Sequence, residues 1–512
     1  MKKVSLSVLM SLVLVASLVS AAETPNIIVI MADDLGYGDI ACNGGSVATP
    51  HIDQLAAEGR RFTSGYCSAS TCTPSRFSLL TGTYAFRVKG TGIAAPNAAA
   101  VIQPGTVTIA SLLKQAGYST AVIGKWHLGL GEGKPDWNGE LKPGPLEIGF
   151  DDCLILPTTN DRVPQVFVQG HRVRNLDPND PLWVGETLPA DHHVTGQSHR
   201  RTLKMDWSHG HDGTIHNGIS RIGFYTGGTR ARFRDEDLAD EWVRESNTWI
   251  EAHRQSPFFL FFAAHDIHVP RVAHERFQGK SGLGPRGDCI VEFDWCVGEL
   301  TRTLDRLGLA ENTLIVICSD NGLVLDDGYK DDAVEKLGSH VPAGPYRGGK
   351  YSVFEGGTRT PFITRWKGRI VPAVSDQIVC TIDLPASFAA LTGQPLADNA
   401  CLDSINVLGA LLGESDAKGR DHLLQQDNTG NKLGLREGNW KLIRNPAGPD
   451  LKKQARESGQ KPPVNQEQLF DLAQDAGEVT NVAAQNPEVL SRMQSRMDSV
   501  LKDGRSRPTV AR

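Results

Sequence analysis

Residues 26–34 read NIIVIMADD, a short continuous apolar run that ends in two acidic residues. A run without polar alternation is typical of a strand buried on both faces of a parallel sheet. Three further apolar runs have the same form: Ser119–Ile123, Pro257–Ala264 and Thr313–Cys318. Helical patterns separate these runs: Pro50–Arg60, Val107–Ala116, Asp235–Arg254 and Asp288–Leu307. The order of strand, polar cluster and helix predicts an α/β fold with a mostly parallel central sheet flanked by helices.

Polar residues follow each of the four predicted strands. In open α/β sheets, ligands bind beyond the carboxyl ends of the strands, so we expect these four clusters to converge. Asp33, Asp34, Asp320 and Asn321 offer only oxygen ligands, which suit Ca²⁺ or Mg²⁺ better than zinc. On these two pairs alone, a metal site and two unrelated solvated turns are equally supported.

Residues 72–76 read Cys-Thr-Pro-Ser-Arg. Proline is favoured in the first turn of a helix, which predicts a helix over Pro74–Leu80 with Cys72 just before its N-terminus. The helix dipole and free N–H groups favour an anion at that position, and Arg76 lies about one turn further along the same face. A buried cysteine beside a surface arginine is the more common meaning of such a pattern when it stands alone.

The N-terminus has the pattern of a secretion signal. Lys2 and Lys3 precede the apolar run Val4–Val19, and Val19-Ser20-Ala21 resembles a cleavage site. A membrane anchor is disfavoured because the run is short for a spanning helix and ends in a cleavage pattern. We therefore expect residues 1–21 to be a signal peptide and the chain to be periplasmic or extracellular.

Composition and charge narrow the class of protein further. The 512-residue chain has a formal net charge of −6 and no basic tail, which argues against nucleic acid as a partner. Its nine cysteines are an odd number for an exported chain, so at least one is unpaired or modified. The character of the sequence changes near Gly419, where short strand-like segments precede a helix over Pro487–Leu501. We expect a main domain over residues 22–418 and a small α+β domain over residues 419–512; the sequence gives no oligomeric state.

The segment Cys72-x-Pro74-Ser75-Arg76-x-x-x-Leu80-Thr81-Gly82 resembles the signature of the type I, formylglycine-dependent sulfatases, arylsulfatase-like enzymes of the alkaline phosphatase superfamily. Seven of its eleven positions are fixed in that signature. Further segments resemble the family's other motifs in the same order: Asp33–Asp39, Gly124–Gly129, Ser319–Gly322, Gly349-Lys350, Glu355–Pro361, Leu469–Leu472 and Glu478–Asn481. The resemblance covers roughly residues 24 to 500 and implies an alkaline-phosphatase-like fold.

The resemblance also implies a chemistry. A formylglycine-generating enzyme would oxidise Cys72 to formylglycine, and one divalent cation, usually Ca²⁺ with Mg²⁺ possible, would be held by Asp33, Asp34, Asp320, Asn321 and residue 72. Arg76 and Lys125 would hold the gem-diol and sulfate oxygens. His127 would act as the base that expels sulfate from a sulfate hemiacetal intermediate. His268, helped by Lys350, would protonate the leaving alkoxide.

Three functions stay open on the sequence. The first is hydrolysis of a sulfated carbohydrate or small sulfate ester, and the second is hydrolysis of a phosphate or phosphonate ester on the same fold. The third is a binding protein without catalysis, if Cys72 stays unmodified. The spacing of His209 and His211 is not typical of a tetrahedral zinc site. We expect these two residues to contact substrate, His265 to be structural or to contact substrate, and His268 to be the acid.

Overall fold

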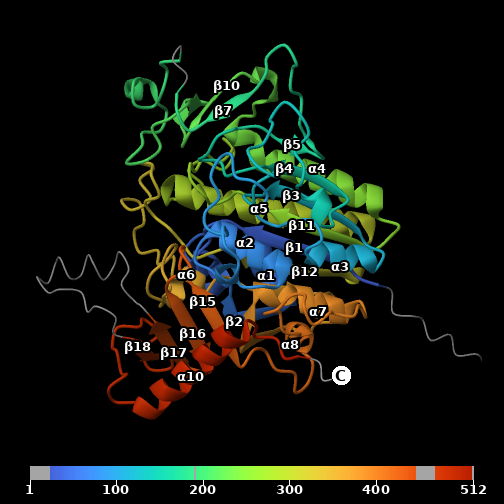
Figure 1. Cartoon of the computed structure of the whole chain (residues 1–512), viewed down its shortest axis with the longest axis vertical. Coiled ribbons are helices and arrows are strands. Elements are labelled where there is room, and N and C mark those ends of the chain that lie inside the picture. Colours follow the sequence, from blue (N-terminus) through green and yellow to red (C-terminus); the bar gives the residue numbers. More distant parts are fainter. Residues whose placement is uncertain (1–23, 189–191, 445–466, 510–512) are drawn as a thin grey trace, which may run out of the picture.

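We describe a computed structural model of the chain, which covers residues 24–188, 192–444 and 467–509 (Figure 1). The predicted signal peptide lies outside these ranges. Within them, no helix combines the length and the apolar character that a membrane crossing requires.

A ten-stranded sheet forms the centre of the molecule, in the order β14-β2-β13-β12-β1-β11-β3-β4-β5-β6. Its strands are β1 (Asn26–Ala32), β2 (Arg60–Tyr66), β3 (Ser119–Lys125), β4 (Asp152–Leu156), β5 (Val168–Gln169), β6 (Arg172–Val173), β11 (Phe258–Ala263), β12 (Thr313–Ser319), β13 (Ile363–Arg365) and β14 (Ala373–Cys380). The strands β12, β1, β11, β3 and β4 are parallel neighbours. The predicted α/β class and mostly parallel sheet are therefore confirmed.

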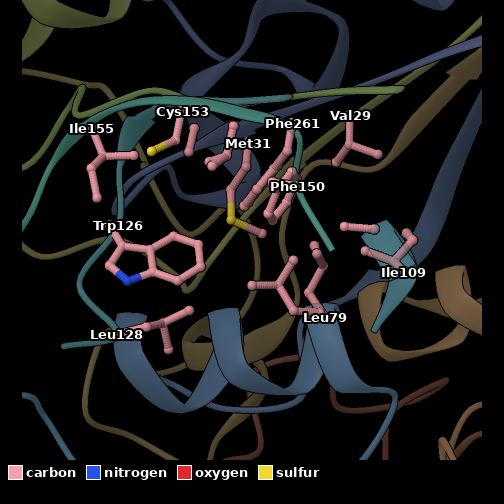
Figure 2. Packing of buried hydrophobic residues seen from close by; sticks show 14 of the residues in the cluster. Val29, Met31, Leu79, Ile109, Trp126, Leu128, Phe150, Cys153, Ile155 and Phe261 are labelled. Atoms are coloured by element: carbon pink, nitrogen blue, oxygen red, sulfur yellow. The ribbon is translucent and has the colours of Figure 1, made fainter. Parts of the chain in front are cut away.

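Both faces of the sheet are covered, as the unbroken apolar run of β1 requires. Ile27, Val29 and Met31 lie in one buried cluster with α2 (Cys72–Thr81), α3 (Ile109–Gln115) and α7 (Leu384–Leu391). Figure 2 shows this side, where Met31 and Leu79 of α2 lie in the same cluster. Ile28 and Ile30 lie in a second cluster with α1 (Pro50–Glu58), α4 (Leu238–His253) and α5 (Gly284–Leu307). Each fully buried aliphatic side chain of this kind contributes roughly 1.5–3 kcal/mol of hydrophobic stabilisation.

The C-terminal part is a separate antiparallel sheet. Its strands are β15 (His422–Gln426), β16 (Leu433–Glu437), β17 (Trp440–Arg444) and β18 (Gln468–Asp471), and α10 (Pro487–Asp503) packs against it through Met493 and Met497. Figure 1 shows this sheet and α10 at the lower end of the molecule. The predicted α+β character is confirmed, and β15 begins three residues after the predicted boundary at residue 419.

The structure differs from the sequence-based expectations in several elements. The strands β2, β4 and β14 were not predicted, because β2 and β14 lack a continuous apolar run and the run in β4 is short. Strand β13 departs from the parallel arrangement, because it pairs antiparallel with both of its neighbours, β12 and β2. Residues 150–230 contain β4 to β6 and four further short strands: β7 (Trp183–Gly185), β8 (Ile215–His216), β9 (Ile219–Ser220) and β10 (Phe224–Thr226). Cys72 is the first residue of helix α2 and not, as predicted, the residue before it. Thr71 is the N-cap, and Pro74 occupies the third helical position.

Candidate active site

The carboxyl ends of four adjacent strands bring the predicted residues together. The ends of β1, β11, β12 and β3 are level, since Met31 pairs with Ala263 and Cys318, and Ala263 pairs with Gly124. Next to these ends stand the pairs Asp33-Asp34 and Asp320-Asn321, Lys125 and His127, and His265 and His268. The expectation that clusters from four distant stretches meet at one edge of the sheet is confirmed.

Four oxygen-bearing side chains lie at the bottom of the site and contact one another. Asn321 Nδ2 donates to Asp34 Oδ1 at 2.7 Å, and the Asp34 N–H donates to Asp320 Oδ1 at 3.3 Å. All four side chains are fully buried: Asp33, Asp34, Asp320 and Asn321. Asp33 Oδ1 and Asn321 Oδ1 have no hydrogen-bond partner among the described residues.

These orphaned oxygens fit a divalent cation. A buried polar atom without a partner is costly, and carboxylate and amide oxygens are the ligands that hard cations prefer. Burial raises the pKa of Asp33 well above its usual value, and the neighbouring Asp320 raises it further. A cation would offset this crowding of carboxylates. Asp33, Asp34 and His268 also form a group whose ligand atoms all lie within 4.8 Å of one another.

Three cationic side chains surround the carboxylates. Arg76 Nε donates to Asp320 Oδ2 at 2.9 Å, and its Nη1 donates to the Lys125 carbonyl at 2.9 Å. Lys125 Nζ forms an ion pair with Asp33, and Lys350 Nζ lies 2.9 Å from Asp34 Oδ2. These contacts fix the cations in place around a small volume next to residue 72, where an anion would be stabilised.

Cys72 is the first residue of α2, and its side chain faces His127. Its Sγ lies 3.2 Å from His127 Nδ1, whereas His127 Nε2 lies 3.1 Å from the Ala94 carbonyl oxygen. Since a carbonyl only accepts, we assign the proton to Nε2, which leaves Nδ1 free to accept one from residue 72. Burial lowers the pKa of His127 well below its usual value, and Lys125 adds to the effect. The imidazole is therefore neutral and available as a base.

The thiol of Cys72 is not set up to act as a nucleophile itself. Burial raises its pKa above the usual value, against the opposing effect of Lys125 and Lys350. Reactive cysteines are thiolates at neutral pH, and this one is held as a thiol. All nine cysteines lie in the described part of the chain as free thiols, including the buried Cys318.

A family model for sulfatases matches residues 25–394. The chain is 47% identical over 482 residues to N-acetylgalactosamine-6-O-sulfatase of Bacteroides thetaiotaomicron. This match covers 94% of this chain and 93% of that protein. It is 32% identical over 501 residues to human arylsulfatase A, covering 94% and 89% of the two chains. The chain belongs to the sulfatase family.

Solved sulfatase structures agree with this assignment. A structure from work on glycosaminoglycan metabolism by Bacteroides thetaiotaomicron superposes with a TM-score of 0.89 at 47% identity, covering 94% of this chain and 99% of that one. The PsFucS1 sulfatase from Pseudoalteromonas sp. is similar in fold, with a TM-score of 0.69 at 24% identity and coverage of 95% and 92%. The alkaline-phosphatase-like architecture expected from the sequence is thus confirmed, and the protein is a sulfatase.

The remaining predicted residues of the sulfatase lie at different depths. His268 is buried, with Nε2 3.9 Å from Asp34 Oδ2 and Nδ1 2.7 Å from the Val269 carbonyl. His211 is buried and its Nε2 lies 3.0 Å from Asp161 Oδ2. His209 is exposed and contacts Ser208 Oγ at 2.9 Å. The predicted substrate contact is compatible with the position of His209 at the surface, and it stays a prediction for all three histidines.

His265 contacts a buried carboxyl group other than those of the predicted cation site. Its Nε2 lies 3.6 Å from Asp266 Oδ1, and these two residues form a buried group with Glu292 of α5. Burial raises the pKa of Asp266 to about 7 and that of Glu292 well above its usual value. Burial thus favours the neutral forms of these two carboxyl groups.

Several site residues were missed by the sequence analysis. Asp327 Oδ2 accepts from Lys350 Nζ at 2.8 Å, and Tyr351 Oη donates to Asp327 Oδ1 at 2.9 Å. Asp161 and Thr159 lie behind His268. All four residues lie in irregular segments, where no periodicity marks a position, and only the concentration of acidic residues around Asp327 gave a signal.

Proposed function

We propose that this sulfatase removes sulfate from a sulfated carbohydrate with formylglycine, made from Cys72, as its nucleophile. The position of residue 72 is the observation that carries the proposal. It stands at the N-terminus of a ten-residue helix, 3.2 Å from His127, and within the electrostatic influence of Lys125 and Lys350. Such a position favours an anion on residue 72 and on the group bound next to it.

Formylglycine in its hydrated form would supply a hydroxyl that attacks sulfur, and a bound cation would favour ionisation of that hydroxyl. Asp33, Asp34, Asp320 and Asn321 would hold the cation, and their oxygen-only donor set supports Ca²⁺. The formylglycine-generating enzyme would act before folding buries Cys72, whose side chain is 3% exposed here. We further propose that the chain is exported, on the pattern of its N-terminus.

The chain's own residues have separate tasks in the reaction. Arg76, Lys125 and Lys350 stabilise negative charge on the sulfuryl oxygens. Nδ1 of His127 accepts a proton from residue 72 when sulfate is released. Nε2 of His268 delivers a proton to the oxygen that leaves with the sugar, since the alkoxide of a sugar is a poor leaving group without one.

A carbohydrate substrate is supported by the relative that is 47% identical, whose name states action on 6-O-sulfated N-acetylgalactosamine. A neighbouring pocket has both polar and apolar groups in its lining. It is lined in part by Ser208, Asp326, Tyr329 and Lys330, and Asp326 precedes the residue that binds Lys350. Hydroxyl, carboxylate and aromatic groups together suit the hydroxyl groups and apolar face of a sugar ring.

The test is a substrate panel with the full chain co-expressed with a formylglycine-generating enzyme. N-acetylgalactosamine 6-sulfate, other sugar sulfates, an aryl sulfate and an aryl phosphonate are compared by kcat/KM. We expect the highest value on a sugar sulfate. Faster cleavage of the phosphonate would overturn the proposal in favour of phosphonate hydrolysis, and turnover of the aryl sulfate alone would overturn the carbohydrate assignment.

A further inference from the structure

A continuous chain of hydrogen bonds connects His268 with a carboxylate that the proposed reaction does not use. His268 Nδ1 lies 3.2 Å from Thr159 Oγ1, and Thr159 Oγ1 donates to Asp161 Oδ1 at 2.7 Å. The other carboxylate oxygen, Asp161 Oδ2, lies 3.0 Å from His211 Nε2. All four residues are at most 5% exposed.

The direction of each bond follows from the donors available. The single proton of the Thr159 hydroxyl goes to the carboxylate, which can only accept, so the hydroxyl oxygen is left to accept from His268 Nδ1. The Val269 carbonyl, 2.7 Å from the same nitrogen, also only accepts. His268 therefore carries a proton on Nδ1, and Nε2 is the nitrogen left to exchange protons. Nε2 lies on the side of the predicted cation site, 3.9 Å from Asp34 Oδ2.

Asp161 is itself held firmly and is ionised. His211 is fixed on its other side, because its Nδ1 lies 2.8 Å from the His209 carbonyl and its ring centroid lies 4.5 Å from that of Tyr329, with the two rings tilted to each other. Although burial opposes it, Arg162 and then His268 and His211 hold the pKa of Asp161 well below its usual value. The chain thus ends in a carboxylate whose position is determined by contacts outside the reacting groups.

We propose that Asp161 is a positioning residue which, through the Thr159 hydroxyl, fixes the orientation of the His268 ring for protonation of the leaving oxygen, while the Val269 carbonyl fixes its tautomer. The inference rests on the proposed role of His268. In that step a hydroxyl oxygen of residue 72 forms a bond to sulfur while the S–O bond to the sugar breaks, and the electron pair of the broken bond stays on the sugar oxygen. His268 enters the step as the imidazolium, with a proton on each ring nitrogen. The His268 Nε2–H bond breaks, its proton forms the new O–H bond, and its electron pair returns to Nε2.

This role has a signature that a merely structural residue lacks. A leaving phenoxide of low basicity needs no proton, whereas a sugar alkoxide does. Weakening the proton donor should therefore slow sugar sulfates strongly and activated aryl sulfates little. General acid catalysis contributes about 10²–10⁴-fold, so a misplaced acid should cost about 10²-fold in kcat on the sugar.

The experiment compares Asp161→Asn and Thr159→Val with the wild type on 4-nitrophenyl sulfate, on aryl sulfates of more basic phenols, and on the best sugar sulfate. We expect kcat for the sugar to fall about 10²-fold in both variants and kcat for 4-nitrophenyl sulfate to change only a few-fold. Thr159→Ser keeps the hydroxyl and should restore the wild-type dependence on the leaving group. Thr158→Val removes a neighbouring hydroxyl that contacts the Arg162 carbonyl instead, and should also keep it.

Several outcomes would overturn the inference. An equal loss on all substrates, with a lowered Tm, would show that the network only supports the fold. A rise in KM at constant kcat would show that Asp161 binds the sugar directly. If the wild type itself released no sulfate from any of these substrates, the proposed function would be wrong. That result is distinguishable from a failure of the Asp161 inference, because it is seen without any variant.

Discussion

Nδ1 of His127 lies 3.2 Å from Sγ of Cys72, and the opposite ring nitrogen lies 3.1 Å from the Ala94 carbonyl. His127 also has a positive φ of 54°, as does Asp34 with 62°. Non-glycine residues in this region of backbone space are uncommon and cluster at functional sites. The backbone thus brings a neutral, oriented base to the residue that carries the chemistry.

Replacing His127 by alanine should reduce kcat by about 10²–10⁴-fold, because no other base among the described side chains is in hydrogen-bond contact with Cys72. Metal content and conversion of Cys72 should stay unchanged. Steady-state kinetics on a sugar sulfate measures the effect. His171→Ala is the control. His171 lies between β5 and β6 and contacts Glu147, so this variant should keep full activity. Equal losses in both variants would contradict the assignment.

Removal of the predicted cation should destabilise the folded chain. Without it, Asp33 Oδ1 and Asn321 Oδ1 are left buried and unpaired. A ligand that binds only the folded state stabilises it by about 2.7 kcal/mol at a concentration of 100 times its Kd. We expect a chelator to lower Tm and Ca²⁺ to restore it.

Variants connect this effect with the site. Asn321→Ala should reduce the Ca²⁺-dependent gain in Tm and the bound metal measured by mass spectrometry. Asn138→Ala removes an exposed amide that contacts the Leu182 carbonyl, and should leave both unchanged. If wild type and Asn321→Ala gained the same Tm from Ca²⁺, the cation would be bound elsewhere.

Glu355 joins the two parts of the chain. This buried residue of α6 (Glu355–Thr358) accepts from Lys441 of β17 at 2.8 Å and from Arg436 of β16 at 3.1 Å. Glu355→Gln leaves buried cations without their carboxylate, which costs about 3–5 kcal/mol. Denaturant unfolding measures the loss. Glu437→Gln removes a partly exposed partner of Arg492 and should cost less than about 1 kcal/mol.

The pH dependence of the same variant has a defined sign. Although burial opposes it, Lys441 and then Arg436 hold the pKa of Glu355 well below its usual value. Its contribution is complete above the unfolded pKa, about 4.3, and is lost as the pH falls through the lower folded pKa. The difference in unfolding free energy between wild type and Glu355→Gln should therefore narrow below about pH 4.3. A constant difference down to pH 3 would contradict this.

The sequence predicted the centre of the fold better than its edges. β1, β11 and β12 are apolar throughout because both of their faces are covered, and such runs are visible without a structure. β14 has exposed residues at its start and a register irregularity, so its pattern resembles a loop. Prediction works where burial alone determines the residue type.

The same distinction applies to the site. Asp33, Asp320 and Lys125 follow predictable strands, and their convergence follows from a parallel sheet. Asp161 and Asp327 reach the site from long irregular segments. Thr159, which contacts Asp161, lies 109 residues along the chain from its partner His268, and Asp327 lies 23 residues from its partner Lys350. Such contacts depend on tertiary packing, which has no periodic signature in the sequence.

The most direct test of the account joins the chemical state of residue 72 to turnover. The wild type, co-expressed with a formylglycine-generating enzyme, and Cys72→Ala are compared by peptide mass and by sulfate release from N-acetylgalactosamine 6-sulfate. We predict an aldehyde at residue 72 and sulfate release in the wild type, with release lost in the variant although its Tm is unchanged. Equal sulfate release by the two proteins, or full activity with an unmodified thiol at residue 72, would contradict the account.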